Sequence, residues 1–325
     1  MARDASSPIV PRARISEPRP TAAGRQCPNC RSEDATVRYD FGEQQILCCR
    51  ACGLLYLHPW PSPEETEAVY GDKYFENEQF MQGTHAGLYG YADYVAERFN
   101  KQIQFAEIAR AIRAKLPEMG GRTPRLLEVG CGFGYFLDVA FEERFDVMGL
   151  EFNPYAVERL RRKYAFPILA GALETAELES GSLDAAVMFD VIEHLRDPFT
   201  SLDHLHEALA PGGVLVLTTV DAESFASRLI GKRLEDFRRT REHLLFFGRT
   251  TMRTVLAQHG FEVTEIRSIG HTFDLAFLIE RLMLYNRPLF GALRRAIVAI
   301  GLGQRQIYLN PGTKMIVYAR RRPER

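Results

Sequence analysis

Strand-length and helix-length segments alternate along most of this chain from residue 125 onward. The strand-length segments are apolar, and helix-length stretches lie between most of them. Neighbouring parallel strands need crossover helices, so this alternation predicts a parallel, doubly wound α/β sheet with helices on both faces. The seven expected strands are 125–130, 145–151, 166–170, 183–189, 213–219, 261–267 and 314–320.

Length and composition exclude several other classes of protein. A chain of 325 residues is long enough for about two domains and for a core that needs no disulfides. With 46% hydrophobic and 26% charged residues, it is neither collagen, nor a mostly disordered chain, nor a simple coiled coil. The net charge of −1 lacks the basic surplus of a nucleic-acid-binding protein. The uncharged runs are shorter than the roughly 20 residues that span a bilayer.

The N-terminal segment combines arginine with proline. Residues 1–26 contain five arginines and four prolines but no apolar h-region, so we do not expect a secretory signal. Such a segment buries too little apolar surface to offset the entropy of ordering, which predicts a disordered basic tail over 1–26. Without a secretory signal, we expect a cytoplasmic location.

Cysteine spacing predicts a metal site close to this tail. Five of the six cysteines fall between residues 27 and 52, which favours metal ligation over disulfides in a reducing compartment. Cys27 and Cys30 form one C-x2-C pair, and Cys49 and Cys52 form a second pair after 18 intervening residues. Two such pairs can close a tetrahedral thiolate site for zinc, and four thiolates leave no coordination position open for chemistry.

We therefore expect a structural zinc ribbon over residues 27–58, with short strands at 36–39 and 45–47. Cys48 lies beside Cys49 and is an alternative ligand, although it breaks the two-residue spacing. In a unit of this size the metal supplies much of the folding free energy.

A glycine loop follows the first expected strand of the sheet. Gly130, Gly132 and Gly134 have the spacing G-x-G-x-G, whereas a dinucleotide fingerprint requires G-x-G-x-x-G. Glu128 stands two residues before the first glycine, and its carboxylate would repel a pyrophosphate but attract a cationic ligand. Glu151 ends the next strand and can accept hydrogen bonds from both hydroxyls of a ribose.

These motifs resemble those of the class I S-adenosylmethionine-dependent methyltransferases. The resemblance covers about residues 120–320, and it implies a Rossmann-like seven-stranded sheet and S-adenosylmethionine as the cofactor. It rests on the segments Glu128 to Gly134, Gly149 to Pro154, Leu183 to Leu195 and Pro211 to Leu217. Within the second segment, Asn153 is expected to cap the following helix.

The resemblance also implies the residues of the cofactor site. The glycine loop would line the methionine half, Glu151 would hold the ribose, and Phe152 would pack on the adenine. Ala172, after the third strand, stands where many members have an acidic residue, so backbone groups are expected to recognise the adenine. The expected cofactor contacts are Glu128, Gly130, Gly132, Gly134, Glu151, Phe152 and Asp190.

Two Glu-His pairs are candidates for the catalytic chemistry. Methyl transfer from a sulfonium is a displacement in which the enzyme supplies proximity and a base for the proton of the nucleophile. Glu193-His194 follows the fourth strand, at the edge where open α/β sheets bind ligands. Glu242-His243 precedes a helix expected at 250–259. The candidate catalytic residues are His243, Glu242 and His194.

Resemblance to two groups of methyltransferases leaves the role of these pairs open. Sugar C-methyltransferases carry an N-terminal zinc ribbon and a Glu-His pair at the position of Glu242 and His243, with the histidine as base. Resemblance to ubiquinone-pathway O-methyltransferases implies instead a divalent ion held by Asp190, Glu193 and His194. A histidine that only packs and forms hydrogen bonds is a third alternative for either pair.

The other segments complete the expected domain organisation. Residues 59–118 are expected to form a linker and a cofactor-covering helical segment, with a tyrosine-rich loop at 70–94 and a helix over 93–116. The methyltransferase domain would occupy residues 119–325. Its two apolar helices over 272–303 also carry arginines, and they would act as a substrate lid, a dimer surface or a membrane-surface hairpin.

The sequence thus predicts methyl transfer from S-adenosylmethionine to an oxygen or carbon of a small-molecule or glycan-linked acceptor, such as a sugar conjugate. Two other functions stay open at this point. An RNA methyltransferase would use the zinc ribbon to grip RNA, although the near-neutral charge makes nucleic acid an unfavourable partner. A non-catalytic zinc-bearing interaction module would keep only a vestigial cofactor site.

Overall fold

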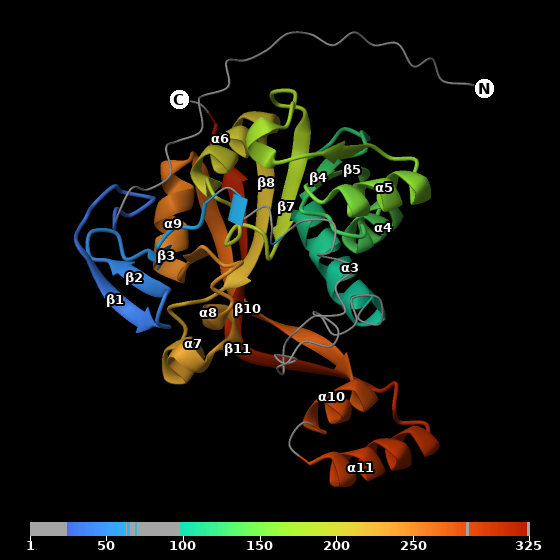
Figure 1. Ribbon diagram of the computed structural model, residues 1–325. Coiled ribbons are helices and arrows are strands. Elements are labelled where there is room, and N and C mark those ends of the chain that lie inside the picture. Colours follow the sequence, from blue (N-terminus) through green and yellow to red (C-terminus); the bar gives the residue numbers. More distant parts are fainter. Residues whose placement is uncertain (1–24, 63, 66–68, 70–97, 284–285, 324–325) are drawn as a thin grey trace.

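The computed structural model describes residues 25–62, 64–65, 69, 98–283 and 286–323 (Figure 1). The predicted basic tail lies outside the described residues except for its last two residues. The predicted tyrosine-rich loop lies wholly outside them. Among the helices of the described part, none combines the length and the apolar character needed to cross a bilayer.

A seven-stranded sheet forms the centre of the molecule (Figure 1). Its strands are β4 (Arg125–Val129), β5 (Asp146–Glu151), β6 (Ile168–Ala170), β7 (Leu183–Phe189), β8 (Leu209–Val220), β10 (Phe261–Asp274) and β11 (Gln306–Arg321). They lie in the order β10-β11-β8-β7-β4-β5-β6. The strands from β4 to β8 pair in parallel, and β11 is antiparallel to β8 and β10. The α/β sheet predicted from the sequence is confirmed.

The strand order reverses direction between β4 and β7. From β4 the chain adds β5 and β6 on one side, and it then returns to add β7 and β8 on the other side. Ligands of open α/β sheets bind at such a switch point, outside the carboxyl ends of the strands. The loops that follow β4, β5 and β7 therefore define the candidate site.

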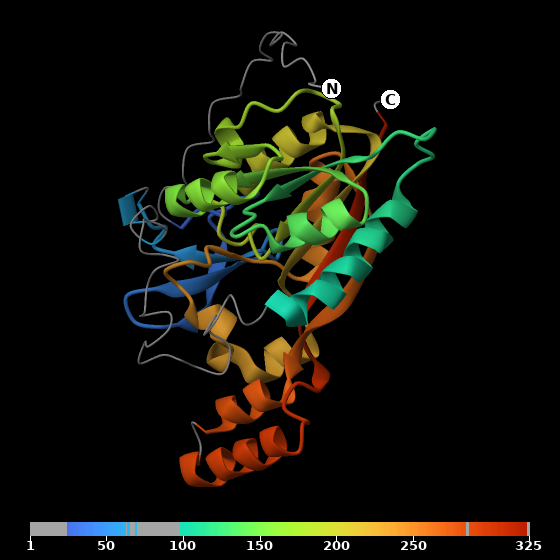
Figure 2. The same cartoon turned by 90° about the vertical axis from the view of Figure 1, so that its right-hand side faces the viewer.

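Helices cover both faces of this sheet (Figures 1 and 2). One face carries α3 (Arg98–Lys115), α4 (Tyr135–Glu142) and α5 (Pro154–Lys163), and the other carries α6 (Pro198–Ala208) and α9 (Arg249–Gln258). Alternate residues of one strand enter the two cores: Val187 of β7 packs on the α3–α5 side, and Met188 packs on the α6–α9 side. This two-residue alternation explains why the strands are apolar throughout.

The cysteine-rich segment forms a second sheet that joins the main body. Its strands are β1 (Ala35–Asp40), β2 (Gln45–Cys49), β3 (Leu55–His58) and β9 (Leu245–Phe246), in the order β1-β2-β3-β9. The sequence predicts β1 and β2 but not the two others. The last strand comes from the segment after Glu242-His243, and it pairs Leu245 with Tyr56 of β3. The ribbon therefore shares one hydrophobic core with α6 and α9.

Short elements connect these units. A 3-10 turn, η1 (Leu173–Thr175), follows β6, and α7 (Phe225–Ile230), η2 (Gly231–Arg233) and α8 (Glu235–Arg238) follow β8. The two predicted apolar helices are α10 (Leu275–Leu282) and α11 (Arg287–Ala299). They begin later than the expected residue 272, because residues 271–274 pair with residues 306–309 and extend β10.

Candidate functional site

The glycine loop after β4 adopts a conformation that favours glycine at three positions. Gly130, Gly132 and Gly134 have φ angles of +67°, +54° and +74°, which side chains with a Cβ atom rarely adopt. A Cβ atom on Gly130 would lie 2.6 Å from Cγ2 of Val191. The loop thus turns tightly against the segment after β7 and leads into α4.

Glu151 is held at the end of β5 by two backbone donors. Its Oε2 accepts the N–H of Gly132 at 2.7 Å, and its Oε1 accepts the N–H of Asn153 at 2.8 Å. The side chain is buried, and this burial raises the pKa of Glu151. A carboxylate has about four acceptor positions, so Glu151 can accept a further hydrogen bond from a ligand. As predicted, Asn153 caps α5, because its Oδ1 accepts the N–H of Ala156.

Glu128 is a buried carboxyl group close to Glu151. Its side chain is 5% exposed, and within the described residues its Oε2 has no hydrogen-bond partner. Burial, and then the charge of Glu151, raise the pKa of Glu128. A buried carboxylate oxygen without a partner is costly, so the position favours a ligand that brings a positive charge.

Asp190 lies directly after β7 and is engaged by the chain itself. Its carboxylate accepts the hydroxyl of Thr218 at 3.1 Å and pairs with Nζ of Lys314 at 2.7 Å. Although burial alone would raise the pKa of Asp190, the ammonium of Lys314 lowers it below its usual value. Sequence reasoning missed Lys314, because β11 lies 124 residues further along the chain.

Glu193, His194 and His243 come together from two separate segments. One ligand atom of each lies within 4.8 Å of those of the other two. The rings of His194 and His243 meet edge to face, with centroids 4.7 Å apart. The backbone N–H of Leu244 donates to the carbonyl oxygen of Glu193 at 2.8 Å and fastens the two segments together.

His243 is buried and His194 is half-buried, and desolvation favours the neutral form of both rings. Desolvation lowers the pKa of His194 to about 3 and that of His243 well below its usual value. Nδ1 of His194 lies 3.0 Å from the carbonyl oxygen of Glu242. A carbonyl only accepts, so His194 carries its proton on Nδ1 and leaves Nε2 as an acceptor. In contrast, Nδ1 of His243 is buried without a hydrogen-bond partner among the described residues.

The sequence predicts Glu242 as a catalytic residue and Asp190 as an alternative metal ligand, and both lie outside the cluster of Glu193, His194 and His243. Glu242 forms an ion pair with Arg239 and lies outside the three-residue cluster. Asp190, expected beside Glu193 and His194 as a metal ligand, is likewise outside that cluster, and His243 takes its place. Burial, and then the charge of Asp190, raise the pKa of Glu193 to about 8.

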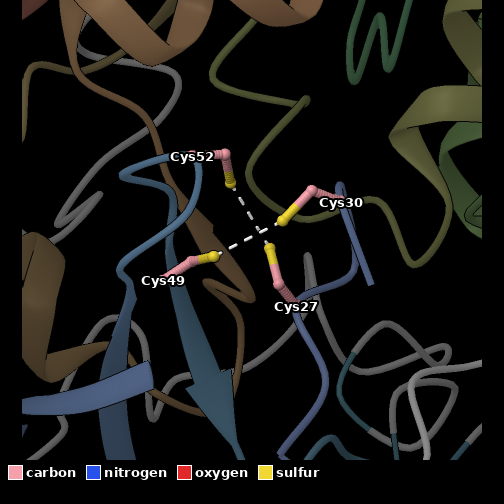
Figure 3. Close-up of side chains that lie close together, drawn as sticks. All are labelled: Cys27, Cys30, Cys49 and Cys52. Carbon is pink, nitrogen blue, oxygen red and sulfur yellow. Dashed lines mark hydrogen bonds between the residues drawn. The ribbon is translucent and has the colours of Figure 1, made fainter. Parts of the chain in front are cut away.

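The four predicted cysteine ligands converge at the edge of the ribbon (Figure 3). The Sγ atoms of Cys27 and Cys52 are 3.6 Å apart, and those of Cys30 and Cys49 are 3.4 Å apart. A tetrahedral site with Zn–S bonds of about 2.3 Å would separate its sulfurs by about 3.8 Å. The donor set therefore fits zinc, and Cys48 lies outside it.

The two residues expected beside the adenine are at least partly exposed. Phe152 follows Glu151 directly, and its side chain is 48% exposed. Ala172 precedes η1 in an extended conformation. An exposed aromatic ring beside a buried carboxylate can cover a planar ligand that enters from solvent.

Comparison with known proteins agrees with this fold. Residues 99–266, about half of the chain, match the family described as "Methyltransferase domain". A protein of Mycolicibacterium smegmatis with the name "Probable S-adenosylmethionine-dependent methyltransferase" is 32% identical over 157 residues, which cover 48% of this chain and 59% of that protein. The ubiquinone biosynthesis O-methyltransferase of Cereibacter sphaeroides is 31% identical over 146 residues, which cover 43% and 56%. The match thus spans a little over half the length of these relatives.

A solved structure supports the fold assignment. A chain from the complex of the Haloferax volcanii Trm112 methyltransferase activator with a methyltransferase is similar with a TM-score of 0.50. It is 15% identical, and the similarity covers 72% of this chain and 97% of that chain. This likeness agrees with the fold, and the family match shows that the chain belongs to the methyltransferase-domain family.

Proposed function

We propose that this protein transfers the methyl group of S-adenosylmethionine to an oxygen or carbon of a small molecule or sugar conjugate. The observation that carries this proposal is the pair of packed histidines at the carboxyl edge of the sheet, which desolvation keeps neutral. A neutral imidazole can accept the proton that an oxygen or carbon nucleophile must lose. The names of relatives such as the ubiquinone biosynthesis O-methyltransferase support an oxygen acceptor.

For the cofactor, we propose that the glycine loop takes the methionine half and that Glu151 binds the ribose hydroxyls. The two backbone bonds to Glu151 support this role, because they orient its carboxylate before a ligand arrives. Glu128, buried without a partner at its Oε2, would stabilise the positive end of the cofactor. Phe152 would cover the adenine. Asp190 contributes through its ion pair with Lys314, which holds the loop after β7.

In the proposed mechanism the acceptor attacks the methyl carbon as the carbon–sulfur bond breaks. The electron pair of that bond leaves with the sulfur, which forms S-adenosylhomocysteine. The proton of the acceptor passes to a ring nitrogen of His243, and His194 packs edge to face on this ring. Burial of the His243 ring would exclude water from it, and the edge-to-face contact would keep the two rings aligned.

A divalent cation at the same cluster is a second candidate for the chemistry. Glu193, His194 and His243 would hold it, and two of their atoms, Oε2 of Glu193 and Nδ1 of His243, are buried without a partner in the described part of the chain. Such a cation would supply Lewis-acid chemistry to an acceptor hydroxyl. Treatment with a chelator, with zinc content followed separately, distinguishes the two cases.

We also infer that the four clustered cysteines hold structural zinc. The fit of the sulfur separations to a tetrahedron and the burial of Cys27 and Cys49 support this inference. The ribbon over residues 27–58 would then act as a brace for the segment that carries His243, because β3 pairs with β9.

The proposed function is tested by release of S-adenosylhomocysteine in the presence of different acceptors. Nucleotide sugars, phenols and lipid-linked acceptors form the main panel, and RNA forms a separate arm. Turnover with a compound of the main panel is the expected result. Turnover with RNA alone would favour the RNA methyltransferase and would contradict the proposal.

With an acceptor in hand, alanine at His243 is expected to lower kcat by roughly 10²–10⁴-fold, the usual contribution of a general base. Binding of S-adenosylhomocysteine should stay unchanged. Since burial lowers the pKa of His243, the base stays neutral as the pH falls through the usual histidine value of about 6.5. The acid limb of the kcat profile should therefore lie below that pH.

Two further variants control this measurement. His194→Ala is expected to lower kcat as well, because His194 supports the His243 ring. His204→Ala changes a part-buried histidine of α6, whose Nδ1 lies 3.2 Å from the carbonyl oxygen of Leu173, and should leave kcat unchanged. Unchanged turnover in both His243→Ala and His194→Ala would exclude histidine from the mechanism.

A further inference from the structure

The hairpin of α10 and α11 extends away from the body of the molecule in both views (Figures 1 and 2). Two backbone hydrogen bonds fix its base. The N–H of Leu275 donates to the carbonyl oxygen of Arg305, and the N–H of Ala276 donates to that of Gly303. An ion pair of 3.1 Å between Glu280 and Arg294, without hydrogen-bond geometry, links the two helices. These contacts hold the two helices together as a defined hairpin that projects from the main body.

Large apolar side chains face outward along α11. Leu289 and Leu293 are 59% and 42% exposed, Ile300 directly after the helix is 67% exposed, and no residue of α11 is buried. With Ala296, these positions follow spacings of four, three and four residues, which places them on one face of the helix. The face packed toward α10 is a different one, with Phe290 and Ile297 partly buried. An apolar stripe of this kind is costly in water, so we expect it to have a partner.

The charged residues of α11 itself are all basic. α11 contains Arg287, Arg294 and Arg295 and no acidic residue. In the part of the chain that the structure describes, neither Arg287 nor Arg295 has a carboxylate partner. An exposed apolar stripe with arginine on the polar side is typical of helices that lie in the interface of an anionic membrane.

The short helix α7, toward the same end of the molecule, also combines exposed apolar side chains with basic residues. Phe225 and Leu229 of α7 are 81% and 73% exposed, the highest values among the exposed large hydrophobic side chains. Arg228, Lys232 and Arg233 follow along the same short segment and are also exposed. Figures 1 and 2 both place α7 toward the end from which the hairpin extends.

We propose that α11 and α7 dock this end of the protein on the surface of an anionic phospholipid membrane. The apolar stripe would enter the acyl boundary, and the arginines and lysine would contact the phosphate groups. A second copy of the chain is a poorer occupant, because a symmetric interface sets each patch against itself, and here it would bring arginine close to arginine. The proposal is independent of the proposed methyl acceptor.

The test is co-flotation of the full chain with vesicles. One set contains phosphatidylcholine alone, and the other contains equal parts of phosphatidylcholine and phosphatidylglycerol. Binding to the anionic vesicles only, weakened by salt, is the expected result. Absence of binding to the anionic vesicles, or equal binding to both sets, would overturn the proposal.

Two variants locate the surface. The double variant Leu289→Asp with Leu293→Asp removes the stripe, and Arg287→Glu with Arg295→Glu reverses its charge; each is expected to weaken vesicle binding at least about tenfold. Both pairs are exposed, so folding should persist, as circular dichroism would show. Phe141→Asp is the matched control, because Phe141 of α4 is 62% exposed and lies on the main body.

Size-exclusion chromatography of the same proteins tests the alternative that the stripe binds a second copy of the chain. A monomer that binds anionic vesicles supports the proposal. A dimer that dissociates in the double leucine variant, without vesicle binding by the parent chain, would assign the stripe to a second copy and overturn it.

Discussion

Substitution of Cys49 by serine is expected to release the bound zinc and to destabilise the whole chain. Elemental analysis should give about one zinc per parent chain, because four thiolates complete the tetrahedral set. Zinc contributes on the order of 10 kcal/mol of folding free energy in small zinc-binding peptides, comparable to the total stability of about 5–15 kcal/mol of many domains. Cys27 and Cys49 belong to the core shared with α6 and α9, so the loss should reach beyond the ribbon.

The measurement is zinc content together with the thermal unfolding midpoint. Cys48→Ser is the matched control, since its sulfur lies outside the four-cysteine cluster although the residue is adjacent to Cys49. This control should keep its zinc and its midpoint. A Cys49→Ser variant with full zinc would exclude the proposed site, whereas zinc loss without destabilisation would exclude only the bracing role.

Substitution of Glu151 by alanine is expected to lower affinity for S-adenosylhomocysteine by at least about 100-fold. Each hydrogen bond from a ribose hydroxyl to a carboxylate is worth about 1.5–3 kcal/mol, and we expect two. The substitution also leaves the backbone N–H groups of Gly132 and Asn153 without their acceptor. The glycine loop should therefore lose part of its preorganisation, which lowers affinity further.

Calorimetric titration with S-adenosylhomocysteine measures this effect. Glu158→Ala is the matched control, because Glu158 lies on the outer side of α5 in an ion pair with Arg162. Glu151→Gln keeps the shape of the side chain and reports the contribution of its charge. Unchanged affinity in a folded Glu151→Ala protein would remove Glu151 from the cofactor site, while the zinc and membrane proposals would stand.

Much of the candidate cofactor site is local in sequence and was therefore predictable. The glycine loop after β4 needs φ angles that favour glycine, and Gly130, Gly132 and Gly134 adopt them. Asn153 caps α5 through a side-chain bond to the backbone three residues on. Interactions over such short spans depend on residue type and spacing, which the sequence states directly.

The packing of His243 against His194 could not be predicted from local spacing in the sequence. The sequence contains two Glu-His pairs, but only the pairing of β3 with β9, and the bonds to the carbonyl of Glu193, place His243 against His194. In the same way, the antiparallel position of β11 next to β8 brings Lys314 to Asp190 and removes Asp190 from the expected metal set.

The sequence by itself determined the alternation of strands and helices, the turn chemistry of the glycine loop and the spacing of the four cysteines. Each of these depends on residues within one or two neighbouring elements. Only the tertiary structure decided which strand pairs with β3, which cation reaches Asp190, and that α11 keeps an exposed apolar face. These contacts join segments that are far apart in the chain, and their free energy comes from packing and pairing that no local pattern encodes.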